Sequence, residues 1–255
     1  MNESIATPYV DPALYDIVYS WYHDDLAFYR DLAKASPGPV LEAACGTGRI
    51  LIPTAQAGVD IDGFDLEPAM IARLKAKASA AELKLRVVVA DMRDFTMPRR
   101  YGLITIPFRA FMHLSTTEDQ IRALRCIREH LEPRGSLVMN VFYPNHAYIA
   151  EHRDQRMLER EIVHPVTGHP IALWSTQRYD LVRQTLFADR EVIETPEDGQ
   201  PVTHHYRFTL RWVYRFEMEL LLRAAGFTRW EVRGGFDGRP LLTPEDEMVW
   251  TAWKD

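Results

Sequence analysis

The 255-residue chain contains only two cysteines, Cys45 and Cys126, far apart in the sequence. Two thiols cannot build a disulfide framework or a four-thiolate metal site, and such low usage is typical of a reducing compartment. No apolar run reaches the length of a membrane-spanning helix. Residues 1–16 also lack the charged-then-apolar pattern of a secretory leader. We therefore expect a cytoplasmic chain without a membrane partner.

An excess of basic charge is absent too, because 36 aspartates and glutamates outnumber 30 lysines and arginines. An acidic surface repels phosphate backbones, so nucleic acid is not the expected partner. The nine histidines show no H-x-x-x-H or comparable spacing, and we predict no metal site. His204 and His205 would point to opposite faces of a strand, so they could not hold one ion together.

What the sequence does contain is an alternation of short apolar strands and helices. A helix is predicted over 11–35, from the spacing of its apolar residues. Beyond it, strands are predicted over 39–44, 59–64, 85–90, 102–107 and 136–142, with helices over about 47–57, from 67, and from a capping box at Ser115–Glu118 to about 131. Strands and helices that alternate at this spacing form right-handed crossovers and a parallel sheet.

The second half of the chain changes character. Longer strands are predicted over 171–180, 185–194 and 202–213, followed by a helix over 214–225 and closing strands over 227–232 and 248–253. The predicted fold class is α/β: a Rossmann-like, mostly parallel seven-stranded sheet with helices on both faces and an inserted antiparallel β meander. The predicted divisions are an N-terminal helical lid at 1–38, a core at 39–142 and 214–255, and a cap at 143–213.

The segment V-L-E-A-A-C-G-T-G-R at 40–49 is the most informative one in the chain. Gly46 and Gly48 permit positive φ and remove the Cβ that would keep a ligand away from the backbone. The helix that follows offers unpaired N–H groups to an anionic group. The same glycines open a dinucleotide fingerprint, but Leu51 stands where its third glycine belongs, which weakens a nicotinamide interpretation without removing it. Asp65, at the end of the second strand, suits ribose hydroxyls in either case.

Three segments together resemble the class I S-adenosylmethionine-dependent methyltransferases: E-A-A-C-G-T-G-R at 42–49, G-F-D-L-E-P-A-M at 63–70 and V-V-A-D-M-R-D-F at 88–95. The closing pattern around 206–227 is similar to one bacterial small-molecule branch of that superfamily. The resemblance covers roughly residues 39–142. It implies S-adenosyl-L-methionine as cofactor, S-adenosyl-L-homocysteine as product and a small-molecule acceptor.

The resemblance also implies roles for particular residues. The turn after the first strand would carry the methionine portion of the cofactor, Asp65 the ribose and Asp91 the adenine amine. Met92 would meet the ring edge, and Leu66 and Met70 would flank the adenosine. Taken singly, Met70 and Met92 are more typical of core residues than of contacts. The implied cofactor-binding residues are Glu42, Cys45, Gly46, Thr47, Gly48, Asp65, Leu66, Met70, Asp91, Met92 and Pro107.

The segment I-P-F-R-A-F-M-H-L at 106–114 stands where this family places the methyl group. It lacks the N/D-P-P-Y/F signature of methyltransferases that act on nucleobase or side-chain amino groups. Phe108 and Arg109 are predicted to contact the acceptor. His113 is the candidate general base, because an imidazole is partly neutral at physiological pH; the alternative is an ordinary loop histidine.

Aromatic residues outside the motifs add a second group of candidates. Tyr15 and Tyr22 are predicted to close over the cofactor, and Tyr206 and Arg207 of the meander to hold the acceptor; the alternative is that the aromatics only pack. The predicted function is methyl transfer to nitrogen or oxygen of a small molecule by a monomer or homodimer. An NAD-dependent oxidoreductase and a non-catalytic S-adenosylmethionine-binding module remain alternatives.

Overall fold

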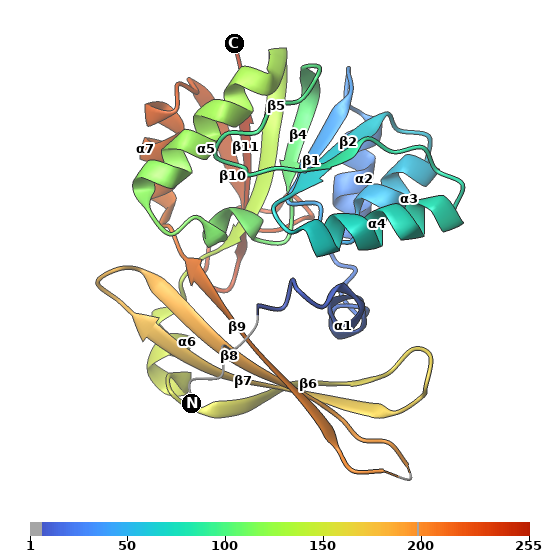
Figure 1. The fold of residues 1–255 in the computed structure, drawn as a ribbon. Coiled ribbons are helices and arrows are strands. Elements are labelled where there is room, and N and C mark those ends of the chain that lie inside the picture. Colours follow the sequence, from blue (N-terminus) through green and yellow to red (C-terminus); the bar gives the residue numbers. More distant parts are fainter. Residues whose placement is uncertain (1–6, 198) are drawn as a thin grey trace. The chain divides into compact units, whose positions relative to one another are not determined.

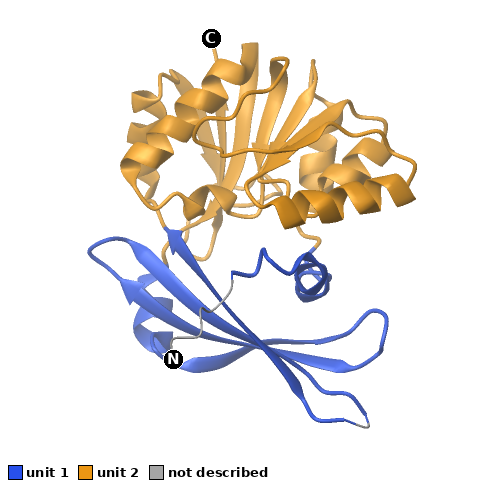
Figure 2. Ribbon diagram, viewed as in Figure 1, with its two compact units in different colours: residues 1–22, 145–211 blue, residues 23–144, 212–255 orange. Residues whose placement is uncertain are grey.

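The computed structural model describes residues 7–197 and 199–255. The chain divides into two compact units, one formed by 1–22 and 145–211 and the other by 23–144 and 212–255 (Figure 2). Residues 23–38, which the sequence groups with an N-terminal lid, therefore belong to the unit that contains the large sheet. A lid role for residues 1–22 stays a prediction.

The larger unit is built on a seven-stranded sheet of order β10-β11-β5-β4-β1-β2-β3 (Figure 1). Its strands are β1 (Val40–Ala43), β2 (Ile61–Asp65), β3 (Val87–Val89), β4 (Tyr101–Ile106), β5 (Leu131–Phe142), β10 (Arg229–Arg233) and β11 (Glu247–Trp253). The first five strands pair in parallel, while β11 runs antiparallel to β5 and β10 antiparallel to β11. The predicted mostly parallel seven-stranded α/β sheet is confirmed.

Helices cover this sheet at both ends of its strand order. Those toward β2 and β3 are α2 (Leu26–Lys34), α3 (Leu51–Gln56) and α4 (Pro68–Ala80); those toward β10 and β11 are α5 (Thr117–His130) and α7 (Arg215–Ala224) (Figure 1). The 3-10 helix η1 (Ala110–His113) follows β4. Helix α5 starts one residue later than the capping box predicts, because Thr116 rather than Ser115 accepts the hydrogen bond from the backbone N–H of Asp119, at 3.1 Å.

At the amino-terminal edge of this sheet, Asp62 of β2 is buried and bound by several donors. Its Oδ2 accepts from Tyr101 Oη at 2.8 Å and from Arg99 Nε at 2.9 Å. A buried carboxylate persists only when donors replace the water that it has lost. This cluster ties β2 to β4 at the edge opposite the predicted site.

Replacing Tyr101 with phenylalanine is expected to lower the free energy of unfolding by about 2 kcal/mol, the usual range for one hydrogen bond to a charged group. The Arg99 contact remains, so the protein should still fold. Urea denaturation at pH 7 gives the measurement. A loss below about 0.5 kcal/mol would show that Tyr101 Oη contributes nothing net.

The smaller unit contains a four-stranded antiparallel sheet of order β6-β7-β8-β9. Its elements are α1 (Pro12–Val18), α6 (His146–His152), β6 (Arg156–Val163), β7 (Pro170–Asp180), β8 (Thr185–Glu194) and β9 (Val202–Arg211). Val18 of α1 packs with buried side chains of the sheet, among them Ile171, Val192 and Tyr206. The predicted meander is confirmed as a separate antiparallel sheet, and the sequence missed α6 and β6. Strand β6 escapes detection because most of its side chains are exposed and show no apolar alternation.

The single helix predicted over 11–35 is wrong. Helix α1 ends at Val18 and α2 begins at Leu26, with turns between them. No proline or glycine marks the break, so helical spacing alone runs across it. The carboxylate of Asp25, just before α2, is bound by Arg49, a contact between distant parts of the sequence that local spacing does not reveal.

Among the described residues, no helix is both long enough and apolar enough to cross a membrane.

Candidate cofactor and acceptor site

The strand order of the large sheet reverses between β1 and β4. From β1 the chain proceeds outward to β2 and β3, and then returns to β4 on the other side of β1. In open α/β sheets, ligands bind at the carboxyl ends of the strands at such a switch point. The turn after β1 and the segment after β4 are therefore the two walls of the candidate site.

The turn after β1 has the backbone geometry that the sequence predicts. Gly46 has a φ of 54° and Gly48 a φ of 85°. A Cβ added at Gly48 would lie 2.9 Å from Ile52 Cγ1, so this position needs glycine for packing as well. At Gly46, an added Cβ would meet no described atom within 4 Å apart from its chain neighbours. Bare backbone thus faces open space at Gly46, as ligand approach requires.

Ala44 is a third residue of this turn with positive φ, at 55°. A left-handed conformation costs a non-glycine residue about 1–2 kcal/mol. We expect Ala44→Gly to raise the free energy of unfolding by about 1 kcal/mol through relief of this strain. The greater conformational entropy of glycine in the unfolded chain offsets part of the gain. Thermal unfolding of the two proteins in parallel makes the comparison. A clear drop in Tm would mean that the methyl group of Ala44 makes a packing contribution larger than the strain.

Asp65 ends β2 and joins it to the turn after β1. Its Oδ2 accepts from the backbone N–H of Gly46 at 2.8 Å, and its Oδ1 accepts from the backbone N–H of Glu67 at 2.9 Å. Burial raises the pKa of this carboxyl, although the two backbone donors act in the opposite direction. Each carboxylate oxygen keeps a further acceptor position, which suits a pair of ribose hydroxyls. Of the neighbours predicted to flank the adenosine, Leu66 is exposed and Met70 is buried in the core.

Glu42 lies on β1 just before the turn, with only 3% of its surface exposed. Its Oε2 is buried and has no hydrogen-bond partner among the residues that the structure describes. Burial raises the pKa of Glu42 to about 8, opposed by the charge of Arg49. A buried carboxyl oxygen without a donor is uncommon in proteins and is typical of a place where a ligand supplies the donor. Cys45 and Thr47 of the same turn are buried as well.

Asp91, at the end of β3, is already bound by a neighbouring cation. Arg93 Nη2 lies 2.5 Å from Asp91 Oδ2, and Arg93 Nε lies 3.0 Å from both oxygens. These bonds hold the pKa of Asp91 below its usual range. Arg93 also reaches Asp119 of α5 at 3.2 Å. Arg93 thus fixes the position of the Asp91 carboxylate, and the contact of Asp91 with the adenine amine stays a prediction. The neighbouring Met92 is buried.

The segment after β4 is named here the β4 loop, residues 107–113. Pro107 is buried, and the next two residues, Phe108 and Arg109, both have left-handed backbones, with φ of 56° and 64°. Backbone strain of this kind costs about 1–3 kcal/mol per residue and is concentrated at functional sites. His113, the candidate base, ends η1 with an exposed side chain.

Arg109 is ion-paired, which the sequence does not reveal. Its Nη2 lies 2.7 Å from Glu247 Oε2 and its Nε 3.0 Å from Glu247 Oε1. Glu247 opens β11, nearly 140 residues along the chain. Arg109 still exposes 47% of its side chain, so its role as an acceptor contact stays a prediction.

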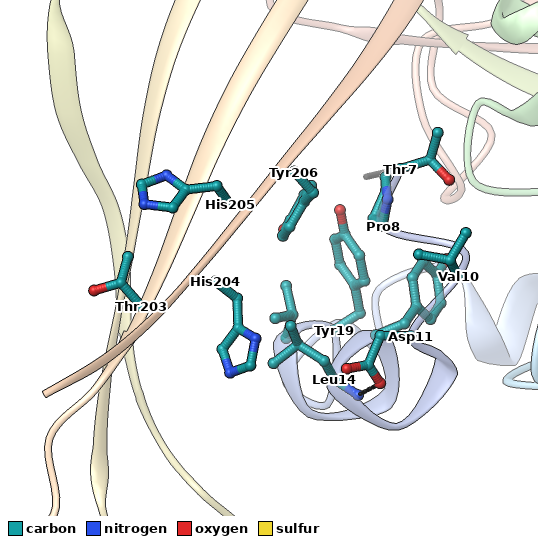
Figure 3. A pocket seen from close by; sticks show the side chains of 12 residues that line it. Thr7, Pro8, Val10, Asp11, Leu14, Tyr19, Thr203, His204, His205 and Tyr206 are labelled. Atoms are coloured by element: carbon teal, nitrogen blue, oxygen red, sulfur yellow. Dashed lines mark hydrogen bonds between the residues drawn. The ribbon is translucent and has the colours of Figure 1, made fainter. Parts of the chain in front are cut away.

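Two predicted residues of the smaller unit line one pocket of about 330 Å³ between α1 and β9. Tyr15 comes from α1 and Tyr206 from β9; the ring of Tyr19 stands beside Tyr206 (Figure 3). His204 points toward α1 and His205 away from it, as the strand alternation predicts. The pocket has a size that fits a sugar or a single heterocycle, and both tyrosines keep their predicted roles as proposals.

Two further predicted residues of this unit lie elsewhere. Arg207, next along β9, points to the face opposite Tyr206 and pairs with Asp189 of β8. Tyr22 packs edge-on against Trp21, with ring centroids 5.5 Å apart.

Four residues near the β1 turn and the β4 loop were not predicted as site residues. Arg49 Nη1 and Nη2 bind Asp25 at 2.6 and 2.8 Å, and the Arg49 guanidinium lies 5.0 Å from the centre of the Phe108 ring. Asn140 of β5 donates to Glu247 Oε1 at 2.6 Å. Only Arg49 had a sequence signal, as the residue that directly follows the glycine turn.

Within residues 7–197 and 199–255, no group of three or more His, Cys, Asp and Glu residues is placed to hold a metal ion.

The residues at the carboxyl ends of β1 and β2 fit the expected cofactor. Gly46 leaves open space against the backbone, Asp65 offers acceptors to a diol, and Glu42 offers an unpartnered buried carboxyl oxygen to an ammonium group. S-adenosylmethionine has a ribose diol and an amino-acid end with an ammonium group, and it needs bare backbone to lie against.

Comparisons with known proteins also indicate a methyltransferase. Residues 40–135 match the family model described as methyltransferase domain. The chain is 28% identical to a dTDP-3-amino-3,4,6-trideoxy-alpha-D-glucopyranose N,N-dimethyltransferase of Streptomyces venezuelae, over 90% of this chain and 94% of that one. It is 25% identical to a cypemycin N-terminal methyltransferase of a Streptomyces species, over 82% of this chain and 80% of the relative.

Solved structures give the same result for the fold. The methyltransferase CcbJ of Streptomyces caelestis superposes with a TM-score of 0.74 at 25% identity, over 96% of this chain and 97% of that chain. DesVI of Streptomyces venezuelae gives 0.75 at 21% identity, over 95% and 98%. Residues 40–135 thus match a methyltransferase domain, and nearly the whole chain resembles S-adenosylmethionine-dependent methyltransferases that act on small molecules.

Proposed function

We propose that this enzyme methylates the amino group of a small-molecule acceptor, and that a nucleotide-linked amino sugar is the acceptor class. The observation that carries the methyltransferase chemistry is the meeting of Gly46, Asp65 and Glu42 at the switch point of the sheet. The acceptor class is supported by two relatives that are dTDP-amino-sugar N,N-dimethyltransferases, one of them aligned over 94% of its length.

The cofactor, when bound, supplies a methyl group made electrophilic by a sulfonium. The protein therefore has to align an acceptor lone pair with the methyl–sulfur bond and keep water away, and needs little acid–base machinery. The Gly46 turn and Asp65 would hold the cofactor on one wall of the crevice. The β4 loop forms the other wall, toward which the acceptor nitrogen would approach. An amine acceptor would lose a proton on methylation, and His113 is the candidate to take it.

The test uses the purified chain with S-adenosylmethionine and dTDP-3-amino-3,6-dideoxy-α-D-glucopyranose. Mass spectrometry should show one and then two methyl groups added to the sugar amine, together with S-adenosylhomocysteine. Glycine and a short peptide with a free N-terminus serve as alternative amines. Tight S-adenosylhomocysteine binding without methylation of any of these amines would overturn the proposed acceptor class. Binding of NAD in place of S-adenosylhomocysteine would overturn the cofactor assignment.

His113→Asn is expected to lower the rate at pH 7 by about tenfold, less than the 10²–10⁴-fold typical of general acid–base catalysis, because the sulfonium supplies most of the driving force. The shape of the acid limb of the pH profile should also change, because asparagine cannot take up a proton and only protonation of the acceptor amine then limits the rate. Initial rates from pH 5.5 to 9 give both quantities. A variant with an unchanged rate and an unchanged profile would assign His113 to the loop alone.

A further inference from the structure

The strained part of the β4 loop is held by a cation–π contact on one side and by an ion pair on the other. On one side, the Arg49 guanidinium lies 5.0 Å from the centre of the Phe108 ring, and Arg49 is itself fixed by both oxygens of the fully buried Asp25. On the other side, Arg109 makes a bidentate pair with Glu247, and its guanidinium lies 5.3 Å from the centre of the Phe142 ring. Phe108 and Arg109 are the two residues with left-handed backbones.

The Arg109–Glu247 pair is anchored in turn by buried polar groups. Asn140 Nδ2 donates to Glu247 Oε1 at 2.6 Å, and Asn140 Oδ1 accepts from Tyr29 Oη at 2.8 Å. Asn140 and Tyr29 are both 1% exposed, so water does not compete for these hydrogen bonds. Tyr29 thereby fixes which amide atom of Asn140 faces Glu247, because its hydroxyl donates to the oxygen.

Both chains of contacts start at the same place. Asp25 directly precedes α2 and Tyr29 lies one turn into it, with the backbone N–H of Tyr29 donating to the carbonyl of Asp25 at 3.1 Å. One short helix thus supports the two strained residues of the β4 loop separately. A conformation that costs backbone strain persists only where its surroundings fix it more than once.

We propose that the first turn of α2 positions the β4 loop for methyl transfer through two relays, Asp25–Arg49–Phe108 and Tyr29–Asn140–Glu247–Arg109. The proposal rests on the proposed function, in which this loop faces the acceptor. Tyr29, Asn140 and Glu247 are then positioning residues: they act through Arg109. Preorganisation of this kind affects the rate of the bound complex more than the affinity for the cofactor.

A pair of matched variants isolates the second relay. Tyr29→Phe removes the hydroxyl that anchors Asn140. Tyr101→Phe removes an equally buried hydroxyl with an equally long 2.8 Å hydrogen bond at the opposite edge of the same sheet. Both substitutions cost stability for the same reason, so a general loosening of the protein would show in both. Glu247→Gln, which keeps the shape and removes the charge, tests the relay one step closer to the loop.

Hydrogen exchange is measured by mass spectrometry on peptides that cover the β4 loop, with S-adenosylhomocysteine bound. Exchange of the loop amides should rise by about tenfold in Tyr29→Phe and in Glu247→Gln, the effect of losing one hydrogen bond, and stay within twofold in Tyr101→Phe. Unchanged exchange in Tyr29→Phe, or an equal rise in Tyr101→Phe, overturns the proposal. This readout needs no acceptor, so it decides the positioning role even if the proposed acceptor class fails.

Single-turnover kinetics provide the second readout, with the acceptor from the assay above at saturation. The methyl-transfer rate should fall five- to tenfold in Tyr29→Phe and Glu247→Gln, while the Kd for S-adenosylhomocysteine stays within twofold. A variant that loses cofactor affinity in parallel with rate would point to a structural role only. Asp25→Asn tests the first relay, and we expect the same split between rate and cofactor affinity.

Discussion

Asp65→Asn is expected to weaken S-adenosylhomocysteine binding by about 100-fold. A hydrogen bond to a charged acceptor contributes about 1.5–3 kcal/mol, and a ribose would place two of its hydroxyls on this carboxylate. Asparagine keeps one acceptor oxygen, but its NH₂ group replaces the other. That NH₂ group cannot accept a hydrogen bond, so a bond from a ribose hydroxyl or from the backbone N–H of Gly46 or Glu67 is lost. A combined loss of about 3 kcal/mol corresponds to two decades in Kd.

Isothermal titration with S-adenosylhomocysteine measures this loss directly. Asp94→Asn is a suitable control, because Asp94 is exposed and pairs only at the surface with Arg122 in the structure described here. The control should bind the product as the unaltered protein does. A loss smaller than about threefold in Asp65→Asn would remove the ribose from this carboxylate, and with it the strongest assignment at the three strand ends.

The strand ends could be predicted from sequence because their chemistry is local. A glycine turn after an apolar strand, followed by an acidic residue at the end of the next strand, specifies both the backbone shape and the ligand type. The structure bears out the positive φ of Gly46 and Gly48 and shows Asp65 bonded to the backbone of Gly46. Parallel strands bring their carboxyl ends together without any information about long-range contacts.

The contacts around the β4 loop could not be predicted in this way. Glu247 and Arg109 meet because β11 is inserted beside β5, which no local pattern reports. Asp25 has the sequence context of an ordinary surface helix cap, yet it is fully buried because Arg49 neutralises it. The break between α1 and α2 could not be predicted for a related reason. It positions Asp25 to bind Arg49, which is distant in sequence, and neither proline nor glycine marks it.

Glu42→Gln is expected to change how the stability of the protein depends on pH. Burial raises the folded pKa of Glu42 to about 8, from a usual value of 4.5. Between these two values the folded state holds a proton that the unfolded state has released. The contribution of Glu42 to stability is therefore fully present below pH 4.5 and is lost as the pH rises toward 8. The shift corresponds to about 5 kcal/mol over that window.

Glutamine has the same shape and stays neutral, so the variant should lack this loss. We expect the two proteins to have similar stability near pH 5 and Glu42→Gln to be the more stable by several kcal/mol at pH 8. Urea denaturation of the ligand-free proteins from pH 5 to 9 follows the divergence. Parallel stability curves across this range would show that Glu42 is already ionised in the folded protein.

The same proton predicts a signature of cofactor binding. An ammonium group placed against the unpartnered Oε2 of Glu42 favours the carboxylate, so binding near pH 7 should release about one proton. Titration of S-adenosylhomocysteine in two buffers with different ionisation enthalpies measures that release, and Glu42→Gln should abolish it. Binding enthalpies that agree in both buffers, with affinity intact, would place the amino-acid end of the ligand away from Glu42. If Glu42→Gln still released a proton on binding, another group in the site would be the one that titrates. Asp65 would then be the first candidate, because burial raises its pKa too.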